Sequence, residues 1–254
     1  DYPGMYLDLH GARLGLKGVF APYPLAFRRG GYNMMNLIPT QRAGHIARTA
    51  GTRAFPWRAI AISEQDKDLL NNDIVQKLAS PSRLDDISWV EPGQVAWDWW
   101  SDYNLSQVDF QAGINTPTYK YYIDFAAANR ARYIILDWNW SETFDLNKIN
   151  PDVDLEEILA HAKSKNVGVI LWASWYTITQ QMHEIFPKYA RMGVKGFKID
   201  FIDRDDQLAV ASTYEIARLA AQHRLLVDYH GVFKPTGLQR TYPNVVGYEG
   251  VYGM

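Results

Sequence analysis

The sequence predicts an α/β fold: a (β/α)8 TIM-type barrel that is incomplete in this chain and is preceded by the end of a β-sandwich domain. From residue 94 onward, short apolar strands alternate with segments whose apolar residues recur at helical spacing, which is typical of a parallel sheet covered by helices. Before residue 63, short alternating runs are interrupted by Gly and Pro, which is a β pattern with turns. Acidic residues follow several of the later strands directly, and barrel enzymes carry their chemistry at those strand ends.

Six strands and four helices are expected in the second part of the chain. The expected strands cover residues 95–100, 133–137, 167–172, 197–201, 225–228 and 245–249, and the helices cover 118–129, 154–165, 180–192 and 207–223. Thr118 and Asp154 are expected to cap the first two helices, and Asp205 and Asp206 the fourth.

Six strands do not close an eight-stranded barrel, so an open doubly wound sheet is the alternative. An open sheet predicts a glycine-rich phosphate turn after an early strand, and because the sequence has none we favour the incomplete barrel.

Three parts are expected along the chain. Residues 1–75 form the C-terminal part of an N-terminal β-sandwich domain, residues 76–93 a linker, and residues 94–254 strands one to six of a catalytic barrel. The linker ends at Glu91-Pro92-Gly93, where the pattern changes. The first residues resemble the middle of a domain and show no signal-peptide pattern.

Composition excludes several classes of partner. The chain has 254 residues, of which 47% are hydrophobic, and this is enough for a sizeable core. A net charge of −2 gives no basic surface for nucleic acid, and no run approaches the roughly 20 apolar residues of a membrane span. There is no cysteine, so the chain offers neither a disulfide nor a thiolate metal site.

Carboxylates and aromatic rings gather at the predicted strand ends. The candidates are Trp97, Asp98, Trp100, Asp102, Asp137, Trp172, Trp175, Asp200, Asp203, Asp228, His230 and Glu249. No His-x-His or His-Glu-x-x-His pattern for zinc occurs, and nucleophile-elbow and P-loop patterns are missing too. Two carboxylates acting on a glycosidic bond fit this set best, since one attacks or activates water while the other donates a proton.

Some of these acids have structural alternatives. Asp137 and Asp228 either cap loops or contact a substrate, and Asp205 and Asp206 are better explained as helix caps. Asp200 is the strongest functional candidate, because it follows a buried strand where an uncompensated carboxylate would be costly.

Six segments of the sequence resemble glycoside hydrolase family 97. They are YPGMYL at 2–7, GTRAFPWR at 51–58, VAWDWW at 95–100, GVKGFKIDFIDRDDQ at 193–207, HGVFKPTGLQRTYPN at 230–244 and EGVYG at 249–253. The resemblance implies a β-sandwich, a (β/α)8 catalytic barrel and a small C-terminal β-domain. It also implies a calcium-dependent enzyme that cleaves α-glucosidic or α-galactosidic bonds, in a periplasmic or secreted bacterial location.

The resemblance further implies roles for single residues. The retaining branch carries its nucleophile at the position of Asp200, whereas the inverting branch has a glutamate directly after the histidine, where this chain has Gly231. A retaining α-galactosidase is therefore expected, with its two carboxylates about 5–5.5 Å apart. The implied substrate-binding residues are Trp97, Asp98, Trp100, Asp137, Trp172, Lys198 and His230, and Glu249 is the implied calcium ligand. The general acid/base is expected just after Met254, so the 254 residues alone are expected to be inactive.

Three alternatives differ in what the strand ends do. The protein could be an α-glucosidase of the same family. Separately, this chain has Trp138 where the family more often has a glutamate, a difference expected to affect sugar preference. It could also be a catalytically silent sugar-binding protein on the same scaffold. The third alternative is a metal-dependent lyase or isomerase with Asp137 and Asp200 as magnesium ligands.

Overall fold

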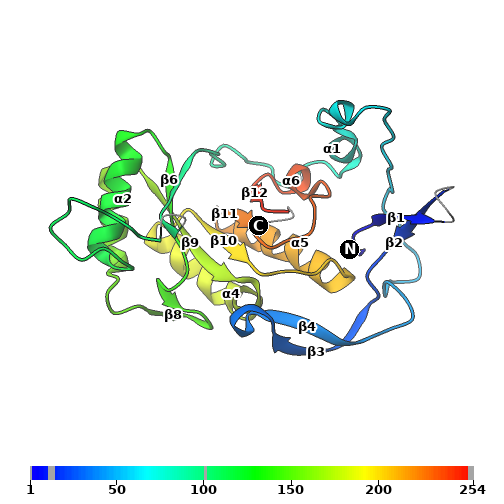
Figure 1. The fold of residues 1–254 in the computed structure, drawn as a ribbon, viewed down its shortest axis with the longest axis horizontal. Helices are drawn as coiled ribbons and strands as arrows, with labels where there is room; N and C mark the ends of the chain where they lie inside the picture. Colours follow the sequence, from blue (N-terminus) through cyan, green and yellow to red (C-terminus); the bar gives the residue numbers. More distant parts are fainter. Residues whose placement is uncertain (1, 11–14, 100–101, 251–254) are drawn as a thin grey trace.

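The computed structural model describes residues 2–10, 15–99 and 102–250. In these residues a six-stranded parallel sheet has the order β12-β11-β10-β9-β6-β5. Its strands are β5 (Val95–Trp97), β6 (Tyr133–Leu136), β9 (Gly168–Ser174), β10 (Gly196–Asp200), β11 (Leu226–Tyr229) and β12 (Val245–Tyr248). Each strand pairs with the next sheet strand along the chain, and the sheet curls into part of a barrel wall (Figure 1). The predicted α/β architecture and all six predicted strands are confirmed. Strands β5, β6 and β12 are shorter than predicted, β9 is longer, and β10 and β11 are each shifted by one residue.

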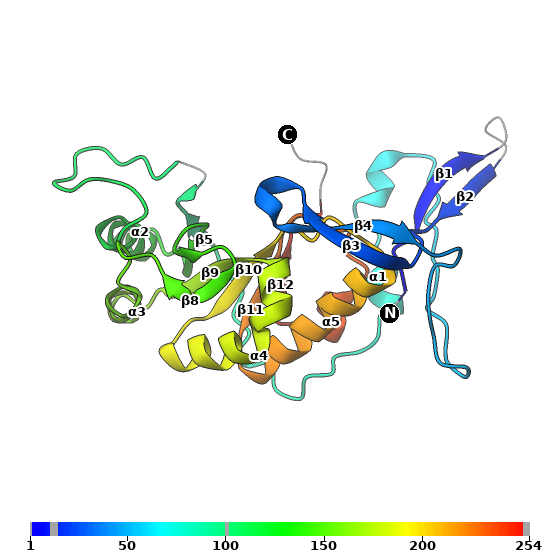
Figure 2. The same ribbon diagram turned by 90° about the horizontal axis from the view of Figure 1, so that it is seen from below.

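Helices connect these strands. The helices are α2 (Thr116–Ala128), α3 (Leu155–Ser164), α4 (Trp175–Met192), α5 (Gln207–Gln222) and the short α6 (Leu238–Thr241). Helices α4 and α5 lie side by side on one face of the sheet (Figure 2). No helix in the described part of the chain is both long enough and apolar enough to cross a membrane.

The helix starts correct part of the sequence prediction. Asp154 and Asp206 are N-caps as predicted, whereas Asp205 is not one. Asn115, rather than Thr118, caps α2, and its side chain accepts a hydrogen bond from the Thr118 amide at 3.0 Å. Helix α4 begins at Trp175 instead of residue 180, because the Ser174 hydroxyl caps it directly at the end of β9.

Two layers of side chains fill the space around the sheet. All five residues of β10 are buried, as are all four of β6, because both faces of the strands are covered. One cluster of buried side chains joins the sheet to its helices and includes Leu171 and Phe197. A smaller cluster, which includes Ile135 and Ile170, lies on the opposite face of the sheet.

A small hairpin between β6 and α3 was not predicted. Strands β7 (Ser141–Glu142) and β8 (Asp145–Ile149) pair there. The pattern missed it because β7 has only two residues and the sequence of β8, DLNKI, does not alternate between apolar and polar residues.

The first part of the chain forms two antiparallel hairpins in its described residues. Strand β1 (Tyr6–His10) pairs with β2 (Gly15–Val19), and β3 (Pro24–Gly30) pairs with β4 (Asn36–Arg42). The 3-10 turn η1 (Tyr32–Met34) joins β3 to β4, and η2 (Asp66–Leu69) and α1 (Ile74–Leu78) follow. The predicted β content is confirmed, and these described residues form two separate two-stranded sheets. That they are the end of a β-sandwich domain stays a prediction.

Hairpin β3–β4 lies against the turn between β10 and α5 (Figure 2). Just after β4, Arg48 exchanges two hydrogen bonds with the Gln207 side chain, at 2.8 and 2.9 Å. The side-chain Nδ2 of Asn36, at the start of β4, donates to the Phe201 carbonyl at 3.3 Å. These contacts bring the tip of the hairpin to the carboxyl ends of the barrel strands.

Candidate active site

A cavity of about 590 Å³ opens at the carboxyl ends of the parallel strands. This is the end of a barrel at which active sites are found. Aromatic rings and charged groups share the wall of this cavity. It is lined by Tyr32, Met35, Trp97, Trp99, Asp137, Trp138, Trp172, Lys198, Asp200, Phe201, His230 and Glu249.

Lys198 is the charged centre of the cavity. Strand alternation places Lys198 and Asp200 on the same face of β10. The Lys198 ammonium donates to the Asp137 carboxylate at 2.8 Å and lies 3.4 Å from the Asp200 carboxylate. Lys198 is only 3% exposed, and a buried ammonium needs such partners. The face of the Trp97 ring, 4.4 Å away, adds a cation–π contact.

The Asp137 carboxylate is held by three donors. The Trp97 indole and the Trp138 amide each donate to it at 2.7 Å, and Lys198 is the third donor. Asp137 follows β6, so the strand end and its neighbours fix the carboxylate in the cavity wall. Asp137 therefore binds the backbone of its own loop and also lines the cavity, and its contact with a substrate stays a prediction.

Asp200 ends β10 and is also held from several sides. The Phe201 amide donates to its Oδ1 at 2.9 Å, and the Trp172 indole donates to its Oδ2 at 3.2 Å. The Lys198 ammonium forms an ion pair with the same Oδ2. Hydrogen bonds that involve charged groups are the stronger ones, so this carboxylate has a fixed direction toward the cavity.

Asp98 lies beside this group and does not line the cavity. It is 1% exposed, and burial raises the pKa of its carboxyl to about 7, with the nearby Asp137 charge acting in the same direction. Asp98 therefore titrates near neutral pH.

His230 lies between two carboxylates. Its Nε2 is 3.1 Å from Asp228, and its Nδ1 is 3.2 Å from Glu249. Burial alone would lower the pKa of His230, but the hydrogen bond and charge of Asp228 outweigh it, so the pKa is raised. The ring stands edge-on to Trp97 at 6.0 Å between centroids, which orients it toward the cavity.

The turn after β10 contains unusual backbone. Phe201 and Asp203 have φ values of +64° and +46°, a region that non-glycine residues rarely adopt. The Asp203 amide donates to the Gly231 carbonyl at 2.7 Å. Gly231 itself has φ +51°, and a Cβ there would lie 2.9 Å from Asp203 and 3.4 Å from Asp200. The space beside Asp200 therefore depends on glycine at 231.

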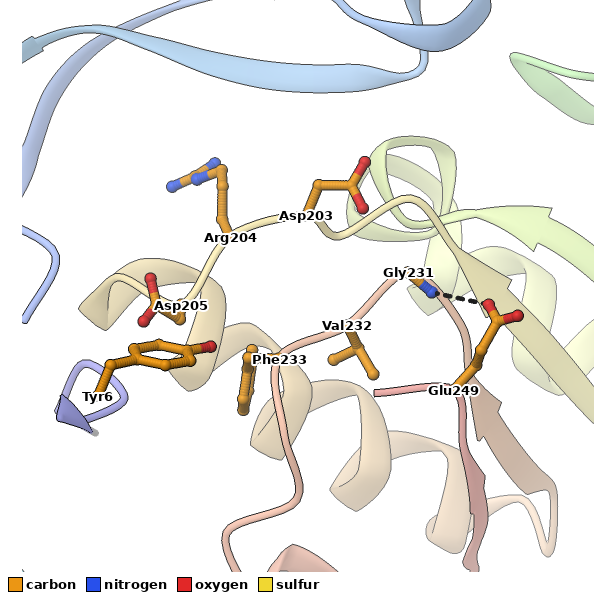
Figure 3. Close-up of a pocket in the computed structure, with 8 residues that line it drawn as sticks. All are labelled: Tyr6, Asp203, Arg204, Asp205, Gly231, Val232, Phe233 and Glu249. Carbon is orange, nitrogen blue, oxygen red and sulfur yellow. Dashed lines mark hydrogen bonds between the residues drawn. The ribbon is translucent and has the colours of Figure 1, made fainter. Parts of the chain in front are cut away.

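A second pocket of about 450 Å³ adjoins the first and shares Glu249 with it. Figure 3 shows Asp203, Asp205 and Glu249 in its wall, with their carboxylates pointing in different directions and the Gly231 amide donating to Glu249. Burial raises the pKa values of Asp203 and Asp205. Calcium takes six to eight converging oxygen ligands. In the described residues no group of three or more acids and histidines is placed to hold a metal.

The structure brings most of the predicted site residues together. Seven of the residues singled out from the sequence line the larger cavity: Trp97, Asp137, Trp172, Lys198, Asp200, His230 and Glu249. Asp98 is buried next to them, and Trp100 lies outside the described residues. Trp99, Phe201 and the hairpin residues Tyr32 and Met35 were missed as cavity residues. For the hairpin the only signal was the Gly30-Gly31 pair, which predicts a turn without saying where it lies.

The comparisons with known proteins agree with this geometry. Residues 1–81 match the glycosyl-hydrolase 97 N-terminal family model, and residues 99–251 match the glycoside hydrolase 97 model. A retaining α-galactosidase of Bacteroides thetaiotaomicron is 46% identical over 100% of this chain and 39% of its own length. A probable retaining α-galactosidase of Streptomyces bingchenggensis is 30% identical over 93% of this chain and 39% of its own length.

A solved structure has the same architecture. A glycoside hydrolase family 97 enzyme of Pseudoalteromonas sp. strain K8, in complex with acarbose, superposes with a TM-score of 0.73 and 26% identity. The match covers 98% of this chain and 40% of the other. A variant of that enzyme, in complex with panose, matches equally well at 27% identity. The chain thus spans about 40% of the length of its relatives. By these matches, the chain belongs to glycoside hydrolase family 97.

Proposed function

We propose that the intact protein is a retaining glycoside hydrolase that cleaves terminal α-galactosides, with Asp200 as the nucleophile. The observation that carries the proposal is the Asp200 carboxylate, which faces an aromatic cavity while three donors fix its direction. Two relatives named as retaining α-galactosidases support the substrate and the stereochemistry.

In the proposed reaction, a free electron pair of an Asp200 oxygen attacks the anomeric carbon of the galactosyl unit. The new carbon–oxygen bond forms as the glycosidic bond breaks, and the departing oxygen takes a proton from a general acid. We propose that this acid follows Met254, as the family resemblance implies. Water then attacks the same carbon and releases Asp200, while the general acid, now acting as a base, takes a proton from the water. Two displacements at one carbon retain its configuration.

The remaining cavity residues are proposed to hold the galactosyl unit. Asp137, Lys198 and His230 place charged hydrogen-bonding groups on one side of the cavity. Trp97 and Trp172 place flat rings beside them, and such rings suit the C–H faces of a sugar. Buried, already oriented polar groups give specificity, because a sugar that lacks the matching hydroxyl leaves them unpaired.

We also propose that the intact protein binds calcium through Glu249 together with ligands beyond the described residues. Glu249 supports this role because its side chain is half exposed and its Oε2 lies near His230 and the Gly231 amide. A metal there would add positive charge at the cavity edge.

An α-glucosidase is the second candidate. The complexes of the Pseudoalteromonas enzyme with acarbose and panose support an oligosaccharide substrate for this family. The two activities differ in the orientation of one hydroxyl on the sugar, which a direct comparison of substrates resolves.

The test uses the full-length protein with an aryl α-galactoside and an aryl α-glucoside, with the product anomer followed by NMR. We expect preference for the galactoside and initial release of the α-anomer. Asp200→Asn should lower kcat by at least about a thousandfold, because the nucleophile is lost. An initial β-anomer would refute the retaining mechanism. Preference for the glucoside would establish the second candidate, and turnover of neither substrate would indicate a sugar-binding protein.

A further inference from the structure

The tip of hairpin β3–β4 forms part of the mouth of the cavity. Tyr32 lines the cavity and is 63% exposed, whereas Lys198 and Asp137 are each 3% exposed. The Tyr32 ring stacks on Phe201, with centroids 5.3 Å apart and an angle of 21° between planes. Phe201 in turn packs edge-on against Trp172. Buried charged groups and an exposed aromatic ring therefore line the same cavity.

The hairpin tip is fixed to the segment that carries Asp200. The side-chain Nδ2 of Asn36 donates to the Phe201 carbonyl at 3.3 Å and to the Asp203 carboxylate. The side-chain Oδ1 of Asn36 accepts a hydrogen bond from the Tyr32 backbone amide at 3.1 Å. Gly31, at φ +66°, makes this possible, because a Cβ there would lie 2.2 Å from the Asn36 side chain. The position of Tyr32 relative to the segment after Asp200 is thus fixed by hydrogen bonds through Asn36.

We propose that Tyr32 determines specificity for the leaving group, as the platform on which the ring beyond the cleaved bond stacks. The inference rests on the proposed function. A galactosyl unit attacked by Asp200 places its hydroxyls among the buried charged groups, and its leaving group then extends toward the mouth. There the exposed Tyr32 ring offers a flat apolar face, backed by Phe201, to a sugar ring or an aromatic aglycone.

Leaving groups with and without a ring test this proposal in the full-length protein. The substrates are α-galactosyl fluoride, an aryl α-galactoside and an α-galactosyl disaccharide. Tyr32→Ala should lower kcat/KM about tenfold for the two ring-bearing substrates and less than twofold for the fluoride. Tyr32→Phe keeps the ring and should stay within twofold of the wild type on all three. Tyr121→Ala is the matched control, because Tyr121 is also exposed but lies on α2 and does not line the cavity.

Two results would overturn the proposal. If Tyr32→Ala lowers kcat/KM by the same factor for all three substrates, its effect is on the fold or on Asp200. If it changes none of them, the ring contacts no leaving group. A wild-type protein that turns over no α-galactoside would instead refute the proposed function, and the role of Tyr32 with it, so the two failures are distinguishable.

Discussion

At the scale of single residues, Asp98 makes the stability of the protein depend on pH. Its pKa is raised from 3.8 to about 7, chiefly by burial. The folded state therefore keeps a proton that the unfolded state loses. The stabilisation from Asp98 is fully present below pH 3.8 and is lost as the pH rises to about 7. The difference corresponds to about 4 kcal/mol.

Asp98→Asn removes this titration while keeping the size of the side chain. We expect the stability of the variant relative to the wild type to rise by about 4 kcal/mol between pH 4 and pH 8. Urea unfolding of both full-length proteins across this range measures it. A difference in unfolding free energy that does not change with pH would contradict the expected titration.

Residue patterns predicted part of the site for a clear physical reason. In the segment Gly196–Asp200, the alternation of a strand places Lys198 and Asp200 on one face whatever the rest of the fold does. Tyr32 could not be predicted in the same way, because its partner Phe201 lies 169 positions further along the chain. Local patterns say which side of its own element a residue occupies, and docking between distant elements decides the rest.

At the scale of elements, the start of α5 joins the hairpin to the barrel. Asp206 is completely buried, and its side chain accepts a hydrogen bond from the Ala209 amide as the N-cap. It also binds the Arg204 guanidinium through two hydrogen bonds of 2.8 Å. Arg204 lies over the Phe27 ring of β3 and donates to the Leu37 carbonyl of β4. One carboxylate therefore supports both the helix and the docking of the hairpin.

Asp206→Ala should destabilise the full-length protein by about 3–5 kcal/mol, because it leaves the nearly buried Arg204 charge unpaired as well as removing the cap. Asp154→Ala is the matched control: Asp154 caps α3 but is exposed, so its loss should cost only about 1 kcal/mol. Urea unfolding compares the two variants. Equal losses would show that the Arg204 pair contributes nothing beyond capping.

Element types were easier to predict than element ends. Six strands and four helices followed from apolar periodicity, since the buried faces of the sheet require it. The predicted end of β9 was wrong because the strand passes directly into α4 at Ser174, so no polar loop separates the strand from the helix. The predicted cap at Thr118 was wrong because Asn115 caps the helix from just before Pro117.

At the scale of the whole molecule, the cavity is assembled from parts that are far apart in sequence. Hairpin β3–β4 supplies Tyr32, β10 supplies Asp200, and the end of β12 leads to Glu249. The chain spans about 40% of the length of its relatives, and the activity proposed above is that of the intact protein. A metal ligated at Glu249 would couple the end of β12 to the loop after β11, where His230 and Gly231 already contact this carboxylate.

Removal of calcium from the intact protein tests this coupling. We expect chelation to lower the melting temperature, because ligand binding stabilises the folded state by mass action. We also expect it to lower the galactosidase activity at least tenfold. Calcium should restore both, and magnesium should not, since it demands six ligands in near-ideal octahedral geometry.

Glu249→Gln should raise the calcium concentration for half-maximal stabilisation about tenfold, because a carboxylate ligand loses its charge. Glu142→Gln is the matched control, because Glu142 is an exposed glutamate on β7 that does not line the cavity. If Glu249→Gln left the calcium dependence of the melting temperature unchanged, Glu249 would not be a ligand. Its carboxylate would then serve to hold His230 at the cavity wall, which a loss of activity without a change in calcium affinity would reveal.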